Sequence, residues 1–178
     1  ARLRFWNLAT GEQLSNLPAL TGGEPLAFSD SGELAASIGP AGSILIFAVG
    51  RPEVIRHLPT ESGVATRVCF LPGEDQVAIG TRSGTVEVWD VPQRSLLVTL
   101  SAGDASVWHL DAHDPGRLTA ALRDGSLLAW ETGTWEPLLV SGIKNVAGIQ
   151  HVVRRDDWLM TGYSDGRINV FRESSDRL

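Results

Sequence analysis

Cysteine, methionine and tyrosine each occur only once in this sequence of 178 residues. The single cysteine, Cys69, cannot form an internal disulfide, and the paired cysteine spacings of structural zinc sites are missing. A chain without disulfides is typical of a reducing compartment, and we therefore expect a cytoplasmic location.

Long apolar runs and an excess of positive charge are also missing. No stretch approaches the ~18 consecutive apolar residues that a membrane helix requires, so no membrane association is expected. The 15 basic residues are outnumbered by 21 acidic ones, which gives a net charge of -6. Because nucleic acid and anionic lipid are bound through clustered Lys and Arg, we expect no nucleic acid partner.

Several motifs of nucleotide and metal chemistry are absent. The sequence contains no Gly-x-x-x-x-Gly-Lys phosphate loop, no Gly-x-Gly-x-x-Gly fingerprint and no His-Glu-x-x-His zinc motif. We therefore expect a protein that is not an enzyme and that binds no cofactor and no metal.

Aromatic residues recur at a nearly constant distance along the chain. Each follows a short segment rich in apolar residues, and the best example is the segment from Thr85 to Asp90. The aromatic positions, separated by 41, 42, 41 and 41 residues, are Trp6, Phe47, Trp89, Trp130 and Phe171. A fixed period of this length indicates one supersecondary unit that is repeated along the chain. No single copy of such a unit can bury its own apolar faces.

Each complete copy contains four strand-like segments separated by turns rich in Gly, Pro, Asp and Ser. The clearest copy has predicted strands at 65–71, 76–81, 85–91 and 95–100. In the next copy the first strand is predicted at 109–113. Over the whole chain the pattern predicts two, four, four, four and three strands.

A period near forty residues, four strands per copy and an ending in Trp-Asp resembles the WD-repeat β-propeller family. The endings that carry the resemblance are Leu3 to Asn7, Val86 to Asp90 and Leu127 to Glu131. The resemblance implies an all-β fold with blades of four antiparallel strands, about four to five of them in this chain. It places blades at 21–60, 61–101 and 102–141, the second half of a blade at 1–20 and a three-stranded last blade at 142–178.

The resemblance also assigns structural roles. Family members usually carry an Asp in the turn before the third strand, where it joins a buried hydrogen-bonded network. That Asp is present here as Asp124 and Asp165 but is replaced by Ala41 and Ser83 in the other complete copies. We expect an incomplete network, with the blades held by packing around the residues Trp6, Phe47, Trp89, Asp90, Asp124, Trp130, Asp165 and Phe171.

The strand count further implies the C-terminal part of a propeller in a longer chain. Two partial blades at the ends leave open faces, and we expect missing N-terminal blades or a second copy to complete the ring. The expected function is a non-catalytic protein interaction scaffold or sensor platform in a larger assembly. Its partners would be other proteins or other domains of the same longer chain.

Partner-binding residues are expected on one face of the propeller, which carries the loops before first strands and between second and third strands. Aromatic and arginine side chains are common anchors of protein interfaces. The residues expected on this face are Glu61, Arg82, Asp104, Trp108, Arg123 and Lys144. The competing interpretation is a half-buried tryptophan surrounded by solvated charges.

An alternative function rests on His109, Asp111 and His113. Alternate residues of a strand project from the same face, so these three side chains could bind a divalent transition metal. The protein would then be a propeller hydrolase or lyase with its site at the channel mouth. The competing interpretation is that these polar residues line a wet central channel.

Overall fold

The computed structural model describes residues 3–17, 26–49, 51, 54–73, 75–112, 115–138, 149–155 and 158–172. Regular structure in these residues is almost entirely β, with one short 3-10 turn, η1 (Pro40–Gly42). No helix in these ranges has the length and hydropathy needed to cross a membrane.

The strands form five antiparallel sheets, in which neighbours in sequence are neighbours in space. In chain order the sheets are β1 (Leu3–Trp6) and β2 (Gln13–Leu17); β3 (Leu26–Phe28), β4 (Leu34–Ile38), β5 (Ile44–Ala48) and β6 (Val54–Leu58); β7 (Ala65–Phe70), β8 (Gln76–Thr81), β9 (Thr85–Asp90) and β10 (Ser95–Ser101); β11 (Val107–Asp111), β12 (Arg117–Leu122), β13 (Leu127–Glu131) and β14 (Pro137–Leu138); and β15 (Ile149–Arg155), β16 (Trp158–Tyr163) and β17 (Ile168–Arg172).

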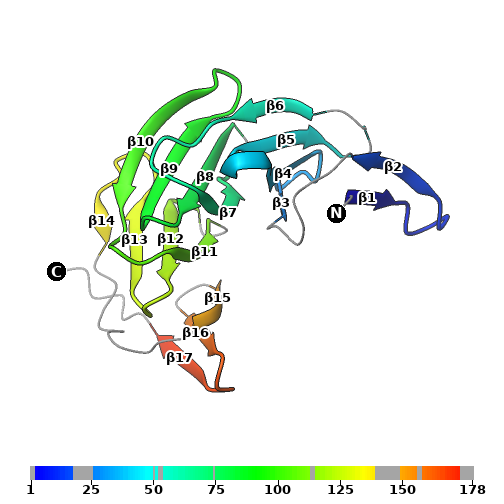
Figure 1. Ribbon diagram of the computed structural model, residues 1–178. Helices are drawn as coiled ribbons and strands as arrows, with labels where there is room; N and C mark the ends of the chain where they lie inside the picture. The colour runs from blue at the N-terminus through cyan, green and yellow to red at the C-terminus, as the bar shows by residue number, and fades with distance from the viewer. Residues whose placement is uncertain are drawn as a thin grey trace.

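The sheets are arranged as a fan around one concave side (Figure 1). The first strands β3, β7, β11 and β15 face this side, and the later strands of each sheet lie progressively further out. Strand β7 contacts β3 and β4 on one side and β11 on the other. This is the arrangement of propeller blades, and it confirms the predicted all-β fold class.

Apolar residues of β8 face alternately into the two interfaces of their blade. Val77 and Ile79 belong to the same buried cluster as Ile46 of β5. Ala78 belongs to the same buried cluster as Val107 of β11. A nearly continuous apolar strand is therefore covered on both faces, because a blade lies against each of them.

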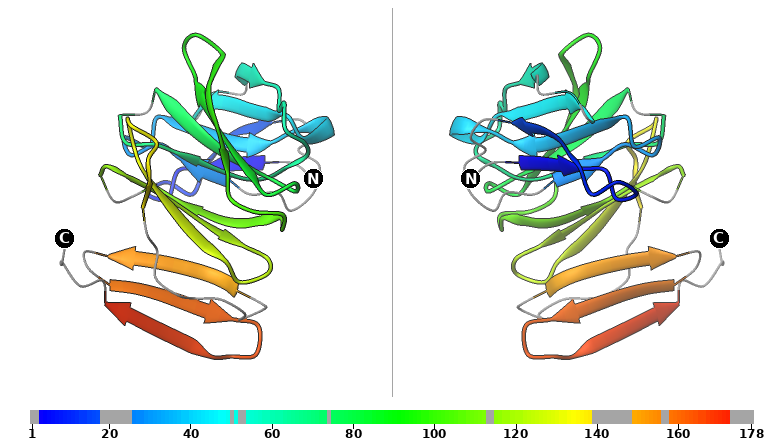
Figure 2. Two further views of the ribbon diagram at one scale, coloured as in Figure 1. Left: turned by 90° about the vertical axis from the view of Figure 1, so that its left-hand side faces the viewer. Right: turned by 90° about the vertical axis from the view of Figure 1, so that its right-hand side faces the viewer.

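The last sheet differs, because other described residues pack against only one of its faces. Val152 and Leu159 pack into a cluster with residues of the preceding blade. Along β17 the burial alternates between exposed and half-buried residues, and Ile168 is 71% exposed. In Figure 2 this sheet, in orange and red, lies at one end of the array.

β-Bulges recur at equivalent positions of the first strands. The register shifts once in β7, once in β11 and once in β15, which leaves Thr66, Trp108 and Gln150 as the extra residues. A bulge reverses the alternation of side chains for the residues that follow it. The prediction of a first strand at 109–113 is therefore wrong: β11 begins at Val107, and an unbroken alternation cannot reveal the extra residue Trp108.

A buried glutamate joins two segments of the best-preserved blade. Glu87 lies at the centre of β9 and is fully buried. Its Oε2 accepts a hydrogen bond from Nε1 of Trp89 at 2.9 Å. Its Oε1 accepts from the backbone N–H of Glu61 at 2.9 Å and from that of Ser62. The expectation that packing holds this blade is therefore incomplete, because the Glu87 carboxylate adds three hydrogen bonds to the packing around Trp89.

Three hydroxyl groups hold the turn between β8 and β9, and one of them bonds the segment before β7 that also bonds Glu87. The Oγ1 of Thr81 lies 2.8 Å from Oγ of Ser83 and 2.6 Å from Oγ1 of Thr85. The Ser83 hydroxyl donates to the carbonyl of Ser62 at 2.7 Å. The turn is therefore held by side-chain contacts at both of its ends.

We predict that Glu87→Gln lowers the free energy of unfolding by about 3 kcal/mol, because one of three buried donors would face an amide N–H. Urea denaturation followed by circular dichroism measures this change as a lower midpoint. The exposed Glu136 supplies the control, since Glu136→Gln removes the same charge. Equal midpoints for the two variants would contradict the role assigned to Glu87.

Candidate partner-binding site

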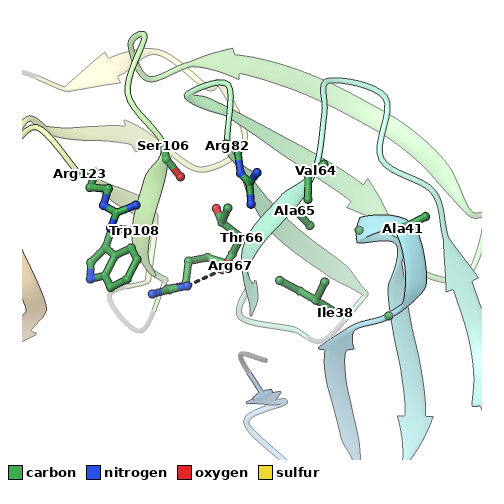
Figure 3. Close-up of a pocket in the computed structure, with 12 residues that line it drawn as sticks. Ile38, Ala41, Val64, Ala65, Thr66, Arg67, Arg82, Ser106, Trp108 and Arg123 are labelled. Atoms are coloured by element: carbon green, nitrogen blue, oxygen red, sulfur yellow. Dashed lines mark hydrogen bonds between the residues drawn. The ribbon is translucent and has the colours of Figure 1, made fainter. Parts of the chain in front are cut away.

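A cavity of about 440 Å³ lies on the face that carries the β4–β5, β8–β9 and β12–β13 turns, which we call the turn face. Residues from three neighbouring blades line it (Figure 3). They are Ile38, Gly39, Ala41, Gly42, Val64, Ala65, Thr66, Arg67, Arg82, Ser106, Trp108 and Arg123.

The Trp108 ring lies close to two arginines, one in β7 and one in the turn after β12. The guanidinium carbon of Arg67 is 4.4 Å from the centre of its ring, and that of Arg123 is 5.2 Å away. Both distances permit cation–π attraction. The indole is half-buried, so the bulge in β11 holds an aromatic surface at the cavity wall.

Arg82 and Arg123 occupy equivalent positions in adjacent blades, 41 residues apart. Each arginine follows the last residue of the second strand of its blade. The backbone N–H of Arg82 donates to the carbonyl of Val64 before β7, and that of Arg123 donates to the carbonyl of Ser106 before β11, both at 2.9 Å. The repeat therefore places an arginine from each of two adjacent blades at the wall of the same cavity.

A hydrogen bond between blades holds the cavity floor. The Oγ1 of Thr66 donates to the carbonyl of Val107 in the next blade at 2.7 Å. The carbonyl of Thr66 accepts from Nη1 of Arg67 at 2.6 Å. The bulge residue thus links two blades and orients one of the arginines beside Trp108.

The cavity is basic on one side and apolar on the other. Its lining includes three arginines and no Asp or Glu. Within the described ranges, no carboxylate lies at ion-pair distance from the guanidinium of Arg82 or Arg123. In Figure 3 the arginines and Trp108 lie to the left and centre, and Ile38 and Ala41 lie to the right.

The predicted partner-binding residues are only partly brought together. Trp108, Arg82 and Arg123 share the cavity. Glu61 and Asp104 are exposed on the loops before β7 and β11 but do not line it. Lys144 lies outside the described residues.

Sequence reasoning missed Arg67. The strand registers make Thr66 the counterpart of Trp108 and Arg67 the counterpart of His109. No repeat spacing therefore relates Arg67 to Trp108, and the contact between them depends on the bulges.

The aromatic residues assigned to blade packing have different environments. Phe47, Trp89 and Trp130 are buried. Phe171 is half-buried and packs against the cluster of the last sheet. Trp6 is 52% exposed, and it belongs to the two-stranded sheet at the other end of the array.

The aspartates of the repeat act within their own turns. The Oδ1 of Asp90 accepts from the backbone N–H of Gln93 at 2.6 Å, and that of Asp124 accepts from Ser126 at 2.9 Å. Asp165 accepts from both the backbone and the side chain of Arg167. The backbone hydrogen bond, followed by the Arg167 side chain, lowers the pKa of Asp165.

The hypothetical metal ligands are not assembled within the described residues. His109 is half-buried, Asp111 is buried, and both belong to β11. His113 lies outside the described residues. No group of three or more His, Cys, Asp or Glu side chains in the described ranges is placed to hold a metal ion.

A Gly-x-Ser-x-Gly pattern occurs from Gly162 to Gly166. In serine hydrolases this pattern forms a sharp turn between a strand and a helix. Here it joins the antiparallel strands β16 and β17, and Ser164 is an exposed residue of that hairpin.

A second cavity, of about 350 Å³, lies between the ends of β3, β7 and β11 on the concave side. Cys69 lines it together with Phe70 and Leu110. Burial, reinforced by the charge of Asp111, raises the pKa of the Cys69 thiol to about 12.

Blades of four antiparallel strands around a concave side define a β-propeller protein. The sequence profile described as WD domain, G-beta repeat matches residues 52–90. This match identifies a WD repeat within these residues and agrees with the propeller arrangement of the described sheets.

Two curated relatives are similar over part of the chain. U3 small nucleolar RNA-associated protein 12 of Saccharomyces cerevisiae is 36% identical over 119 residues, which are 66% of this chain and 12% of that protein. Nucleoporin Nup43 of Mus musculus is 30% identical over 111 residues, 53% of this chain and 29% of that protein. The chain thus spans less than a third of the length of either relative.

Solved structures share the fold at low identity. U3-55K matches with a TM-score of 0.83 and 20% identity over 96% of this chain and 54% of its own. The computationally designed Ika4 protein matches with a TM-score of 0.73 and 21% identity over 92% of this chain and 99% of its own.

The predicted cytoplasmic location is wrong. The yeast relative is named for a small nucleolar RNA and the mouse relative is named a nucleoporin, which points to the nucleus. The physical reason is that disulfides are rare in the nucleus as well as in the cytosol, so a single cysteine cannot distinguish these compartments.

We predict that Cys69 reacts with iodoacetamide at pH 8 at least ~100-fold more slowly in the folded protein than in urea, because only the thiolate is nucleophilic. The pKa of the folded thiol, about 12, lies above the 9.0 of an unperturbed thiol. The stability supplied by the neutral thiol is therefore complete below pH 9 and is lost as the pH rises towards 12. Mass spectrometry measures alkylation at this single cysteine, and equal rates in both states would contradict the raised pKa of the folded thiol.

Proposed function

We propose that this chain is a non-catalytic protein interaction scaffold, or sensor platform, within a larger protein or complex. The observation that carries the proposal is the cavity on the turn face, where Trp108 lies beside Arg67 and Arg123. Tryptophan and arginine dominate binding energy at protein interfaces, especially in pockets formed by a rigid scaffold.

The proposed binding site is rigid before a partner arrives. The turn that carries Arg82 is fixed by the hydroxyl groups of Thr81, Ser83 and Thr85. Thr66 links the two blades that supply Arg67 and Trp108. Preformed geometry reduces the entropy lost on binding, so few contacts can give useful affinity.

The absence of catalysis is part of this proposal. It is supported by the kind of relatives found: a WD-repeat family match, a protein named for its association with a small nucleolar RNA, and a nucleoporin. The partners proposed for this chain are other proteins of a nuclear assembly or other domains of its own longer chain.

We predict that Trp108→Ala and Arg123→Gln abolish capture of partner proteins from nuclear extract that the unaltered chain retains. Both variants remove side chains that line the cavity. Quantitative mass spectrometry of the captured proteins provides the measurement. Arg94→Gln is the matched control, because Arg94 is exposed in the β9–β10 turn at the opposite end of β9.

Retention of the same partners by Trp108→Ala and Arg123→Gln, with unchanged circular dichroism, would refute the proposed site. Loss of partners from the Arg94→Gln control as well would show that net charge, rather than the cavity, governs capture.

Further blades of a longer chain are proposed to cover the exposed faces of the array. The last sheet exposes a group of apolar side chains, namely Val153, Trp158, Met160, Ile168 and Val170. The match to U3-55K covers only 54% of that chain, so the solved structure extends well beyond the part that this chain resembles. The blade limits 21–60, 61–101 and 102–141, with partial blades at 1–20 and 142–178, belong to the same proposal.

We predict that the isolated chain of 19.1 kDa associates with a second copy, because exposed apolar faces of this kind are buried by association. Light scattering after size exclusion measures the mass. Ile168→Glu should shift the population towards monomer, whereas Leu97→Glu, on the fourth strand of an internal blade, should not. A stable monomer of the unaltered chain would count against both further blades and self-association.

A further inference from the structure

We infer that the cavity on the turn face binds an acidic peptide segment, in which two carboxylates contact the arginines and an adjacent apolar side chain lies against Ile38 and Val64. The inference rests on the proposed function and specifies the chemistry of the partner. It is argued from the charge of the cavity, the two guanidinium groups close to the Trp108 ring and the division of the lining into a basic and an apolar side.

The charge of the cavity is opposite to that of the protein. The whole chain carries a net charge of -6, yet the cavity lining contains three arginines and no acidic residue. Like charges gathered in one concave site repel each other and attract an anion. Arg82 and Arg123 form no ion pair within the described part of the chain. Their guanidinium groups can therefore donate hydrogen bonds to the carboxylate of a bound ligand.

The position of two guanidinium groups close to one indole ring, at 4.4 and 5.2 Å from its centre, favours carboxylate recognition. A guanidinium held near an aromatic ring can still form paired hydrogen bonds with a carboxylate through its N–H groups. Arg67 uses one Nη1 hydrogen bond for the carbonyl of Thr66. This hydrogen bond restrains the Arg67 side chain, so binding would cost less side-chain entropy.

Several features favour a peptide over a nucleic acid. Nucleic acids are bound by extended basic grooves with several stacking aromatics, whereas this site is one cavity with one aromatic residue, Trp108. Glu61 and Asp104 are exposed on the loops that precede β7 and β11, so a polyanion extending beyond the cavity would meet negative charge. The apolar wall, with Ile38 and Val64, suits an aliphatic side chain next to the acidic ones.

Fluorescence anisotropy with short labelled peptides tests the inference on the whole chain. One peptide contains Glu-Glu-Leu at its centre, a second contains Gln-Gln-Leu and a third contains Glu-Glu-Ser. A fourth replaces one Glu by phosphoserine, and a single-stranded oligouridylate serves as the nucleic acid probe. We expect the Glu-Glu-Leu peptide to bind at least ~10-fold more tightly than the Gln-Gln-Leu peptide, since charged hydrogen bonds are lost with the carboxylates.

Variants locate the binding site. We expect Arg82→Gln and Arg123→Gln each to weaken binding of the Glu-Glu-Leu peptide at least ~10-fold, while Arg94→Gln, with the same charge change, leaves it within about twofold. We also expect binding to weaken with increasing salt. Ile38→Ala should reduce the preference for Glu-Glu-Leu over Glu-Glu-Ser. Circular dichroism of each variant establishes that the fold is retained.

Equal binding of the Glu and Gln peptides, or equal binding by Arg94→Gln and Arg123→Gln, would overturn the inference. Tighter binding of the phosphoserine peptide would assign the site to phosphate instead of carboxylate. Tighter binding of oligouridylate that depends on Arg82 and Arg123 would assign it to RNA. If the peptides fail but capture of partners still depends on Trp108, the scaffold function stands and only the acidic ligand is wrong.

Discussion

Burial of apolar surface between neighbouring sheets is the constraint on which the rest of this structure depends. A single blade here has apolar side chains on both faces, as β8 shows with Val77 on one side and Ala78 on the other. Neither face can be buried within the blade itself, so each blade requires two neighbours. The exposed apolar residues of the last sheet follow from the same rule, because that sheet has a described neighbour on one side only.

This packing leaves the two ends of the blades available for function. The strands are occupied with their neighbours, and the turns between them are under weaker constraint. Glu87 strengthens the arrangement by satisfying Trp89 and two backbone N–H groups in the interior. A rigid interior and turns whose sequence can vary together allow arginines from two blades to lie beside one tryptophan.

The sequence predicted the blades well because they depend on a period, and predicted the site less well because it depends on exceptions to that period. The spacing of Trp89 and Trp130 was sufficient for the fold. Glu87 was missed because a lone charged residue in an alternating strand suggests exposure to solvent, while its partners lie 25 and 26 residues away. Arg67 was missed because the bulge in β7 changes which residues face the cavity. The location was wrong because cysteine content does not separate the nucleus from the cytosol.

The repeated bulge has a consequence for how such proteins diversify. Its backbone geometry recurs in β7, β11 and β15, while its residue changes from threonine to tryptophan to glutamine. A substitution at this position changes the side chain that a blade presents, while the antiparallel pairing of the strand on either side of the bulge is kept. Where the bulge residue also bonds the next blade, as Thr66 does through the carbonyl of Val107, a change in ligand preference also removes a contact that holds two blades together.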